Sequence, residues 1–326
     1  MVADMRHNRD KTMNTANEDI SALNRDFGVP GRIAFREGPL GEPIIVLVEA
    51  HGSCEVSFHG AHVLSYRPTG HAPVLWLAKS FKTLAPGKAI RGGVPVCWPW
   101  FGPCEGLPMH GFARTSRWQL LKTDYDSYST AVTLVLEDTD ETMAIWPHRF
   151  RLEYEVSVGA TLRLSLSTTN TGDAPFEIRE ALHSYFVVGD AASVSVEGLD
   201  GVKYLDSAPG GADAVQSGDV RIEAETDRIY IDAPDETFIS DPVAGRRIRI
   251  AKDGAADCVV WNPWIEKAAR LADMDDDDYH RFLCVETAQT RPISVAPGET
   301  HHVRASISSE LPKADGDSVQ PGSAAS

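Results

Sequence analysis

Two neighbouring segments in which apolar and polar residues alternate constrain the fold of this chain most strongly. Residues 150–158 read FRLEYEVSV and residues 162–167 read LRLSLS, so every second side chain is apolar. A period of two is typical of a β-strand with one buried face. Gly159 and Ala160 stand between the two segments, and such a short connection predicts a hairpin. The pattern therefore predicts an antiparallel sheet.

Similar short runs recur along the chain with turn signals between them. They are Ile44–Val48, Val63–Tyr66, Val74–Leu77, Val132–Leu136, Val194–Val196, Arg228–Ile231, Ile248–Ile250, Cys258–Trp261, Leu283–Val285 and Val303–Ile307. Helical patterns are confined to Trp264–Met274 and Glu141–Ile145. Many short strands with few short helices predict an all-β fold, a large antiparallel β-sandwich. A parallel sheet is disfavoured because its long amphipathic helices are missing.

Composition divides the chain into one folded region and two polar ends. Residues 1–26 are rich in Asn, Asp, Arg and Thr without apolar periodicity, which predicts a mobile N-terminal arm or one that docks loosely on the fold. Residues 312–326 are rich in Pro, Gly, Ser, Ala and Asp, which predicts a disordered C-terminal tail. Between them we find no linker and no repeat, so residues 27–311 are expected to form a single β-sandwich domain.

The charge and the cysteines exclude several classes of function. The net charge of −16 makes binding to nucleic acid or to an anionic membrane improbable. Any anionic ligand must meet a local basic patch, for which Arg91, Arg114 and Arg117 are the candidates. The five cysteines form no CxxC pair, which favours reduced thiols in a cytoplasmic protein. The start of the chain has no apolar leader segment, and the longest aliphatic run is too short to span a bilayer.

The segment from Arg91 to Trp118 combines cations, aromatic rings and four prolines. Prolines lack a backbone donor and glycines permit left-handed turns, so the segment is expected to be a long ordered loop. Arg91 and Arg114 would suit phosphate or carboxylate oxygens, and Trp98 and Trp100 would suit the apolar face of a sugar. The same residues also fit a plug between two sheets, and the segment alone leaves both interpretations open.

Three further polar residues are candidates for chemistry. His183 lies in a strand-like run, Glu286 ends an apolar run, and Asp227 begins a predicted strand. Burying such a carboxylate is costly unless a partner compensates it. Taken alone, each residue also has an ordinary structural explanation: a core histidine bonded to a carbonyl, a strand-end glutamate in solvent, and the first residue of a strand.

Five motifs taken together change that balance. They read RGGVP at 91–95, LPMHGFAR at 107–114, LHSY at 182–185, VWNPWIEK at 260–267 and CVE at 284–286. In order and spacing this set resembles the hexose-6-phosphate 1-epimerases, the phosphosugar branch of the aldose 1-epimerase (galactose mutarotase-like) family. The resemblance covers residues 30 to 310 or so. It implies a β-sandwich of the galactose mutarotase-like supersandwich type with an open cleft on one sheet.

The resemblance also implies roles for particular residues. His183 matches the family's general acid and Glu286 its general base. The positions that match substrate-binding residues are Arg91, His110, Arg114 and Asp227. The implied reaction opens and recloses the sugar ring by proton transfer and needs no metal or nucleotide cofactor. Two places depart from the family pattern. Met109 stands where some relatives have a polar residue, and the residues after Glu286 differ from the Pro-Gly turn of other members. The sequence therefore does not determine the shape of the loop next to Glu286.

The implied partner is a small phosphorylated hexose, most simply glucose 6-phosphate, bound by a monomer or a weak homodimer. Two other functions fit the same residues. One is a non-catalytic sugar-phosphate binder, since a fold does not fix a function. The other is a mutarotase for unphosphorylated aldoses. The presence of both His183 and Glu286 argues against the first, and the pair Arg91 and Arg114 argues against the second. His110 could bind substrate or brace its loop.

Overall fold

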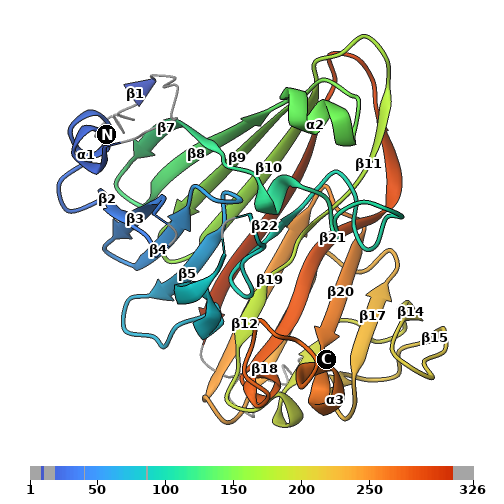
Figure 1. Cartoon of the computed structure of the whole chain (residues 1–326). Helices are drawn as coiled ribbons and strands as arrows, with labels where there is room; N and C mark the ends of the chain where they lie inside the picture. Colours follow the sequence, from blue (N-terminus) through green and yellow to red (C-terminus); the bar gives the residue numbers. More distant parts are fainter. Residues whose placement is uncertain (1–8, 11–18, 40, 86, 311–326) are drawn as a thin grey trace, which may run out of the picture.

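A computed structural model describes residues 9–10, 19–39, 41–85 and 87–310 of the chain. Within this part the polypeptide forms three sheets, and all pairs between named strands are antiparallel (Figure 1). The predicted all-β antiparallel class is therefore confirmed. The predicted tail at 312–326 lies outside the described residues.

The first sheet has ten strands. In spatial order they are β1 (Arg9–Asp10), β7 (Gln119–Tyr125), β8 (Thr130–Glu137), β9 (Phe150–Val158), β10 (Leu162–Asn170), β22 (Thr300–Glu310), β19 (Arg246–Asp253), β18 (Glu236–Asp241), β13 (Ser195–Glu197) and β16 (Val220–Arg221). The predicted hairpin is its centre, because Val158 pairs with Leu162 across the turn. Tyr154 in β9 and Leu166 in β10 are buried, as their alternation predicts.

The second sheet carries the candidate site. Its order is β15 (Ala214–Val215), β14 (Lys203–Asp206), β17 (Thr226–Tyr230), β20 (Asp257–Asn262), β21 (Phe282–Val295), β11 (Phe176–Leu182) and β6 (Val96–Cys97), and β12 (Tyr185–Val187) also pairs with β21. The first eight residues of β21 are all buried, which fits a central strand covered on both faces. The loop containing residues 91–118 supplies only the short edge strand β6.

A third sheet and a few short helices complete the fold. The sheet consists of β2 (Ile33–Glu37), β3 (Pro43–Glu49), β4 (Gly52–Ser57) and β5 (Val63–Pro68). The helices are α1 (Ile20–Asp26), α2 (Asp140–Ile145) and α3 (Trp264–Ala268), with 3-10 turns η1 (Lys79–Thr83), η2 (Ala113–Thr115), η3 (Ala191–Ser193) and η4 (Asp278–His280). None of the helices in the described ranges is long and apolar enough to cross a membrane.

One apolar cluster joins the three sheets. It contains Phe35 from the small sheet, Tyr154 from the ten-stranded sheet and Val285 from the eight-stranded sheet, each at most 4% exposed. A shared core of this kind supports the predicted single domain over residues 27–311, which stays a prediction.

Two predicted elements differ from the structure. Val74–Leu77 is no named strand and makes only isolated bridges, from Leu75 to Phe186 and from Leu77 to Gly92. Phe186 belongs to the three-residue strand β12 and Gly92 to a loop, so neither pairing extends into a ladder. The helix predicted over Trp264–Met274 ends at Ala268. Beyond it the Ser80 hydroxyl donates to the Asp273 carbonyl at 2.6 Å, so tertiary contacts override the local helical pattern.

The predicted arm over residues 1–26 contains an ordered helix. Asp19 caps helix α1, and Leu23 within that helix is 1% exposed. The Asn24 side chain accepts from the Phe35 N–H at 2.9 Å and donates to the Phe35 carbonyl at 2.7 Å, which fastens the helix to β2. The folded body therefore begins before residue 26, and residues 1–8 and 11–18 lie outside the described part.

A substitution in the central hairpin tests this account of the core. Leu164→Ala in β10 removes a side chain that is 1% exposed, and we expect the free energy of unfolding to fall by about 2–5 kcal/mol. The exposed neighbour Arg163 provides the control, since Arg163→Ala is expected to change the stability by less than about 0.5 kcal/mol. Urea denaturation measures both. Equal losses in the two variants would contradict the assigned faces of the strand.

Candidate active site

Adjacent strands of the eight-stranded sheet bring a row of side chains onto one face. The register pairs Asp227 with Trp261, Trp261 with Cys284, and Tyr185 with Cys284. Side chains directly opposite each other in an antiparallel pair point to the same face. Glu286 follows Cys284 by two residues in β21 and therefore shares that face. Residues up to 101 positions apart in the sequence thus meet on one surface.

His183 and Glu286 form a buried pair on this face. The imidazole Nε2 lies 3.3 Å from the carboxylate Oε1, and the two residues are 7% and 2% exposed. The ring of His183 stacks on Tyr185 with centroids 4.8 Å apart. Among the described residues, neither Nδ1 of His183 nor Oε2 of Glu286 has a hydrogen-bond partner. Buried polar atoms without partners are rare, and here each member of the pair has one.

The surroundings favour a neutral pair. Burial, together with the nearby Asp227, raises the pKa of the Glu286 carboxyl well above its usual value. Burial, His110 and the cations Arg114 and Arg91 lower the pKa of His183 well below its usual value. In the neutral form of the pair the shared proton is on Glu286, whose Oε1 lies 3.3 Å from the imidazole Nε2. The neutral imidazole then carries its own proton on Nδ1.

Arg91 lies beside the pair and is held by two partners. Its Nε and Nη2 lie 3.0 and 2.9 Å from Oδ2 of Asp273, and its Nη1 donates to the Tyr185 hydroxyl at 3.0 Å. Gly92 takes φ = +100°, and a Cβ there would lie 2.5 Å from the Trp76 carbonyl oxygen, so the backbone next to Arg91 requires glycine. A guanidinium has five N–H donors, so two remain for an anion.

His110 and Arg114 share the loop that borders the pair. Nδ1 of His110 accepts from the Gly102 N–H at 3.0 Å, and the rings of His110 and His183 lie 5.8 Å apart. Burial and the nearby arginines lower the pKa of His110 to about 3, so Nε2 of a neutral ring is its donor. Arg114 donates from Nη2 to the Met109 carbonyl at 2.6 Å, and its buried Nε has no partner within the described chain.

Asp227 is on the opposite flank of the site. Lys267 approaches its Oδ2 to 3.5 Å and Oε1 of Glu225 to 2.8 Å. Burial raises the pKa of Asp227, although Lys267 opposes this. The six residues predicted for the site thus gather around one face of the sheet: the pair His183 and Glu286, the loop residues Arg91, His110 and Arg114, and Asp227.

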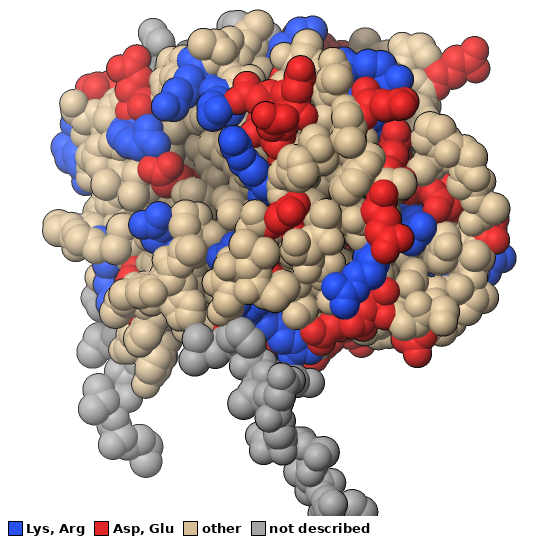
Figure 2. All heavy atoms as spheres, turned by 90° about the horizontal axis from the view of Figure 1, so that it is seen from below, with Lys and Arg blue, Asp and Glu red and all other residues tan. Residues whose placement is uncertain are grey.

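The basic groups of the site lie in a molecule whose surface carries both signs of charge. On the face in Figure 2, Lys and Arg side chains are interspersed with Asp and Glu. Arg117, which is close to Arg114 in the sequence, pairs instead with Glu42 at 3.5 Å. The local cations beside the pair are therefore Arg91 and Arg114.

The aromatic residues of the proline-rich loop do not have the role suggested for them. Trp98 is fully buried and packs 4.5 Å from Phe150, and Trp100 is 5% exposed. Both tryptophans are packed in the core, which agrees with the alternative interpretation of the segment as a plug between two sheets. The aromatic rings next to the pair are instead Tyr185 and Trp261, whose centroids lie 4.8 and 6.2 Å from that of His183.

Sequence reasoning missed three partners of the site. Tyr185 follows His183 by two residues, so a period of two could have placed it on the same side. Lys267 lies within the motif at 260–267, but its place in a predicted helix did not show which way its side chain points. Asp273 is 182 residues from Arg91, and no local pattern connects them.

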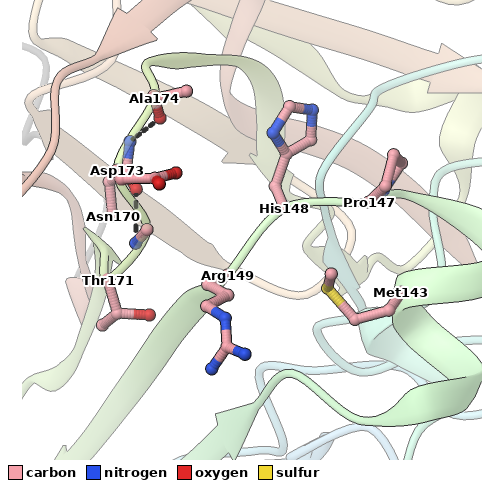
Figure 3. Close-up of a pocket in the computed structure, with 9 residues that line it drawn as sticks. Met143, Pro147, His148, Arg149, Asn170, Thr171, Asp173 and Ala174 are labelled. Atoms are coloured by element: carbon pink, nitrogen blue, oxygen red, sulfur yellow. Dashed lines mark hydrogen bonds between the residues drawn. The ribbon is translucent and has the colours of Figure 1, made fainter.

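A separate hollow of about 420 Å³ contains none of the predicted residues. It lies where the connection after α2 meets the turn between β10 and β11, with His148, Arg149 and Asp173 around it (Figure 3). The Asn170 side chain there donates to the Ala174 carbonyl at 2.9 Å and accepts from the Gly172 N–H, so it braces the turn. In Figure 1, α2 lies at the opposite end from α3.

Comparisons with known proteins cover most of the chain. The family model described as Aldose 1-epimerase matches residues 43–308, a range that contains all six predicted site residues. A protein of Escherichia coli (strain K12) named "Putative glucose-6-phosphate 1-epimerase" is 40% identical over 250 residues, which are 74% of this chain and 82% of that protein. One of the same name from Cenchrus ciliaris is 36% identical over 285 residues, covering 83% and 85%.

The fold has a similar solved relative. The crystal structure named "a putative mutarotase (YeaD)" from Salmonella typhimurium matches with a TM-score of 0.81 and 32% sequence identity. The match covers 87% of this chain and 96% of that one. The predicted mutarotase type of β-sandwich is thus confirmed.

Proposed function

The chain belongs to the aldose 1-epimerase family, and from this premise we propose that it interconverts the α and β anomers of a hexose 6-phosphate. The family consists of isomerases, which fits a site built for proton transfer. The names of the two relatives support glucose 6-phosphate as the substrate. The observation that carries the proposal is the buried contact between His183 and Glu286, each with one unpartnered atom.

The neutral pair can relay one proton between the two oxygens on the anomeric carbon. The anomeric hydroxyl O1 gives its proton to Oε2 of Glu286, while Oε1 passes its proton to Nε2 of His183. The imidazole releases its Nδ1 proton to the ring oxygen O5, the C1–O5 bond breaks, and the aldehyde forms. Rotation about C1–C2 and the reverse relay close the other anomer. O1 and O5 are bonded to the same carbon, so two adjacent groups can serve both.

The cations would hold the far end of the substrate. Arg91 keeps two N–H donors, and Arg114 spends one of its five on the Met109 carbonyl, so both keep donors for a phosphate. Their bonds to the 6-phosphate are the same before and during ring opening, so they favour binding and orientation over kcat. Nε2–H of His110 and the Asp227 carboxylate would bond the hydroxyls of the sugar.

Each of the two alternative functions leaves one feature of the site unexplained. A non-catalytic sugar-phosphate binder does not require an imidazole and a carboxyl group in buried contact. A mutarotase for unphosphorylated aldoses has no need for two guanidinium groups beside the pair, in a chain of net charge −16. A cytoplasmic location also stays a prediction, which the five free cysteines support.

Exchange NMR on the wild-type protein tests the proposal. Saturation of the α-anomer signal is transferred to the β anomer at the rate of ring opening. We expect catalytic amounts of protein to speed this transfer for glucose 6-phosphate more than for glucose. Faster transfer for glucose would favour the unphosphorylated substrate, and binding of the phosphosugar without any transfer would favour a sensor.

Removal of one guanidinium tests the phosphate role. We expect Arg91→Ala to raise KM for glucose 6-phosphate by about 10- to 100-fold, because a charge-assisted hydrogen bond contributes about 1.5–3 kcal/mol, and to change kcat much less. Arg117→Ala is the matched control, since Arg117 pairs with Glu42. Equal losses on glucose and on glucose 6-phosphate would show that Arg91 does not contact the phosphate.

A further inference from the structure

Lys267 joins two carboxylates at the flank of the catalytic pair. Its Nζ lies 2.8 Å from Oε1 of Glu225 and 3.5 Å from Oδ2 of Asp227. The same ammonium lies 5.8 Å from the centroid of the Trp261 ring. The lysine comes from α3, Asp227 from β17 and Trp261 from β20, so the contact ties a helix to two strands of the sheet.

The acidic groups of this cluster approach the pair. Asp227 raises the pKa of Glu286, and Glu225 and Asp206 raise the pKa of Asp227, after burial as the main cause for both. Asp206 is itself paired with Arg228 at 3.0 Å. Lys267 is thus the cation that acts directly on Asp227, and its side chain is 31% exposed.

Several other charged or titratable groups face the same region from neighbouring elements. They are His183, just before β12, Tyr185 in β12, Cys284 in β21, Cys97 in β6, and the loop residues Arg91, His110 and Arg114. The cations among them, Arg91 and Arg114, act on the imidazole of His183. On the carboxylate side, the charge is set by Lys267, Glu225 and Asp227.

We propose that Lys267 is a positioning residue, which holds Glu225 and Asp227 as a fixed ion cluster so that the catalytic proton stays between Glu286 and His183. The inference rests on the proposed function. Without the ammonium, two buried or half-buried carboxylates would lie unpaired near Glu286 and would bind a proton in competition with the relay. The orientation of Asp227 toward the sugar hydroxyls would be lost as well.

The test is the pH profile of kcat for glucose 6-phosphate in Lys267→Met. The relay needs one proton on the pair, so the rate falls at low pH, where His183 gains a second proton, and at high pH, where Glu286 loses the shared one. Removing a positive charge raises the pKa of both groups. Both limbs of the profile are therefore expected to move to higher pH, by about one unit.

Two further variants make this test specific. Lys267→Arg keeps the charge and is expected to restore the wild-type limbs. Glu225→Gln removes a negative charge and is expected to move both limbs to lower pH, which keeps the proposal testable if Lys267→Met does not fold. Unmoved limbs in Lys267→Met, with only a higher KM for the phosphosugar, would show that Lys267 binds the phosphate directly and would overturn the proposal. Wild-type protein without activity would instead overturn the proposed function itself.

Discussion

Replacing Glu286 with glutamine is expected to lower kcat for the exchange of glucose 6-phosphate anomers by about 10²- to 10⁴-fold, the usual contribution of one general acid-base group. Glutamine keeps the shape of the side chain, but its amide accepts no proton from O1 and passes none to His183. The phosphate contacts proposed for Arg91 and Arg114 do not involve Glu286, so Kd for the sugar phosphate should stay close to the wild-type value. Exchange NMR measures the rate and titration calorimetry the affinity.

The neighbouring position Thr287 provides a control for Glu286→Gln. Thr287 is 2% exposed and points to the other face of β21, so Thr287→Val should leave kcat near the wild-type value. A Glu286→Gln variant with near-normal exchange would rule out Glu286 as the base. A variant that no longer binds sugar phosphate would assign Glu286 to binding instead.

Replacing His183 with glutamine is expected to have an effect of similar size. The glutamine amide can still donate to Glu286 but cannot take a proton from Oε1 and release one to O5, so the relay is interrupted at its second step. We again expect kcat to fall by about 10²- to 10⁴-fold with binding retained. Stopped-flow polarimetry of fresh α anomer provides an independent measurement of the rate.

The double variant shows whether the two residues act as one unit. Groups that share one proton path give losses that do not multiply, so the double variant should be no slower than the slower single variant. Multiplied losses would mean that His183 and Glu286 act on the substrate separately, without a proton passing across their 3.3 Å contact.

Local patterns in the sequence predicted much of the sheet structure. The alternation in residues 150–167 predicted β9 and β10 because one face of each strand is buried and the other is polar. Two other predictions were wrong, the strand Val74–Leu77 and the second half of the helix Trp264–Met274, because long-range contacts decide the backbone there. The site residues came from family motifs rather than from periodicity. The structure brings them together around one face of the sheet, and their roles stay predictions.

The remaining features of the site depend on register, which local sequence does not encode. Nothing near Arg91 indicates that Asp273 is its partner, and nothing near Asp227 indicates that β20 places Trp261 opposite it. The aromatic loop shows the same limit, because a buried Trp98 and a sugar-facing one have the same sequence. The shift of each pKa is also a property of the folded site, since burial and distant charges cause it.

One comparison tests the central claim most directly: the rate of α to β exchange of glucose 6-phosphate with catalytic amounts of wild-type protein and of the double variant His183→Gln, Glu286→Gln. The account predicts a large acceleration by the wild type and, for a folded double variant, a rate within about tenfold of that in buffer alone. Wild-type protein that leaves the buffer rate unchanged, or a double variant nearly as fast as the wild type, would contradict it.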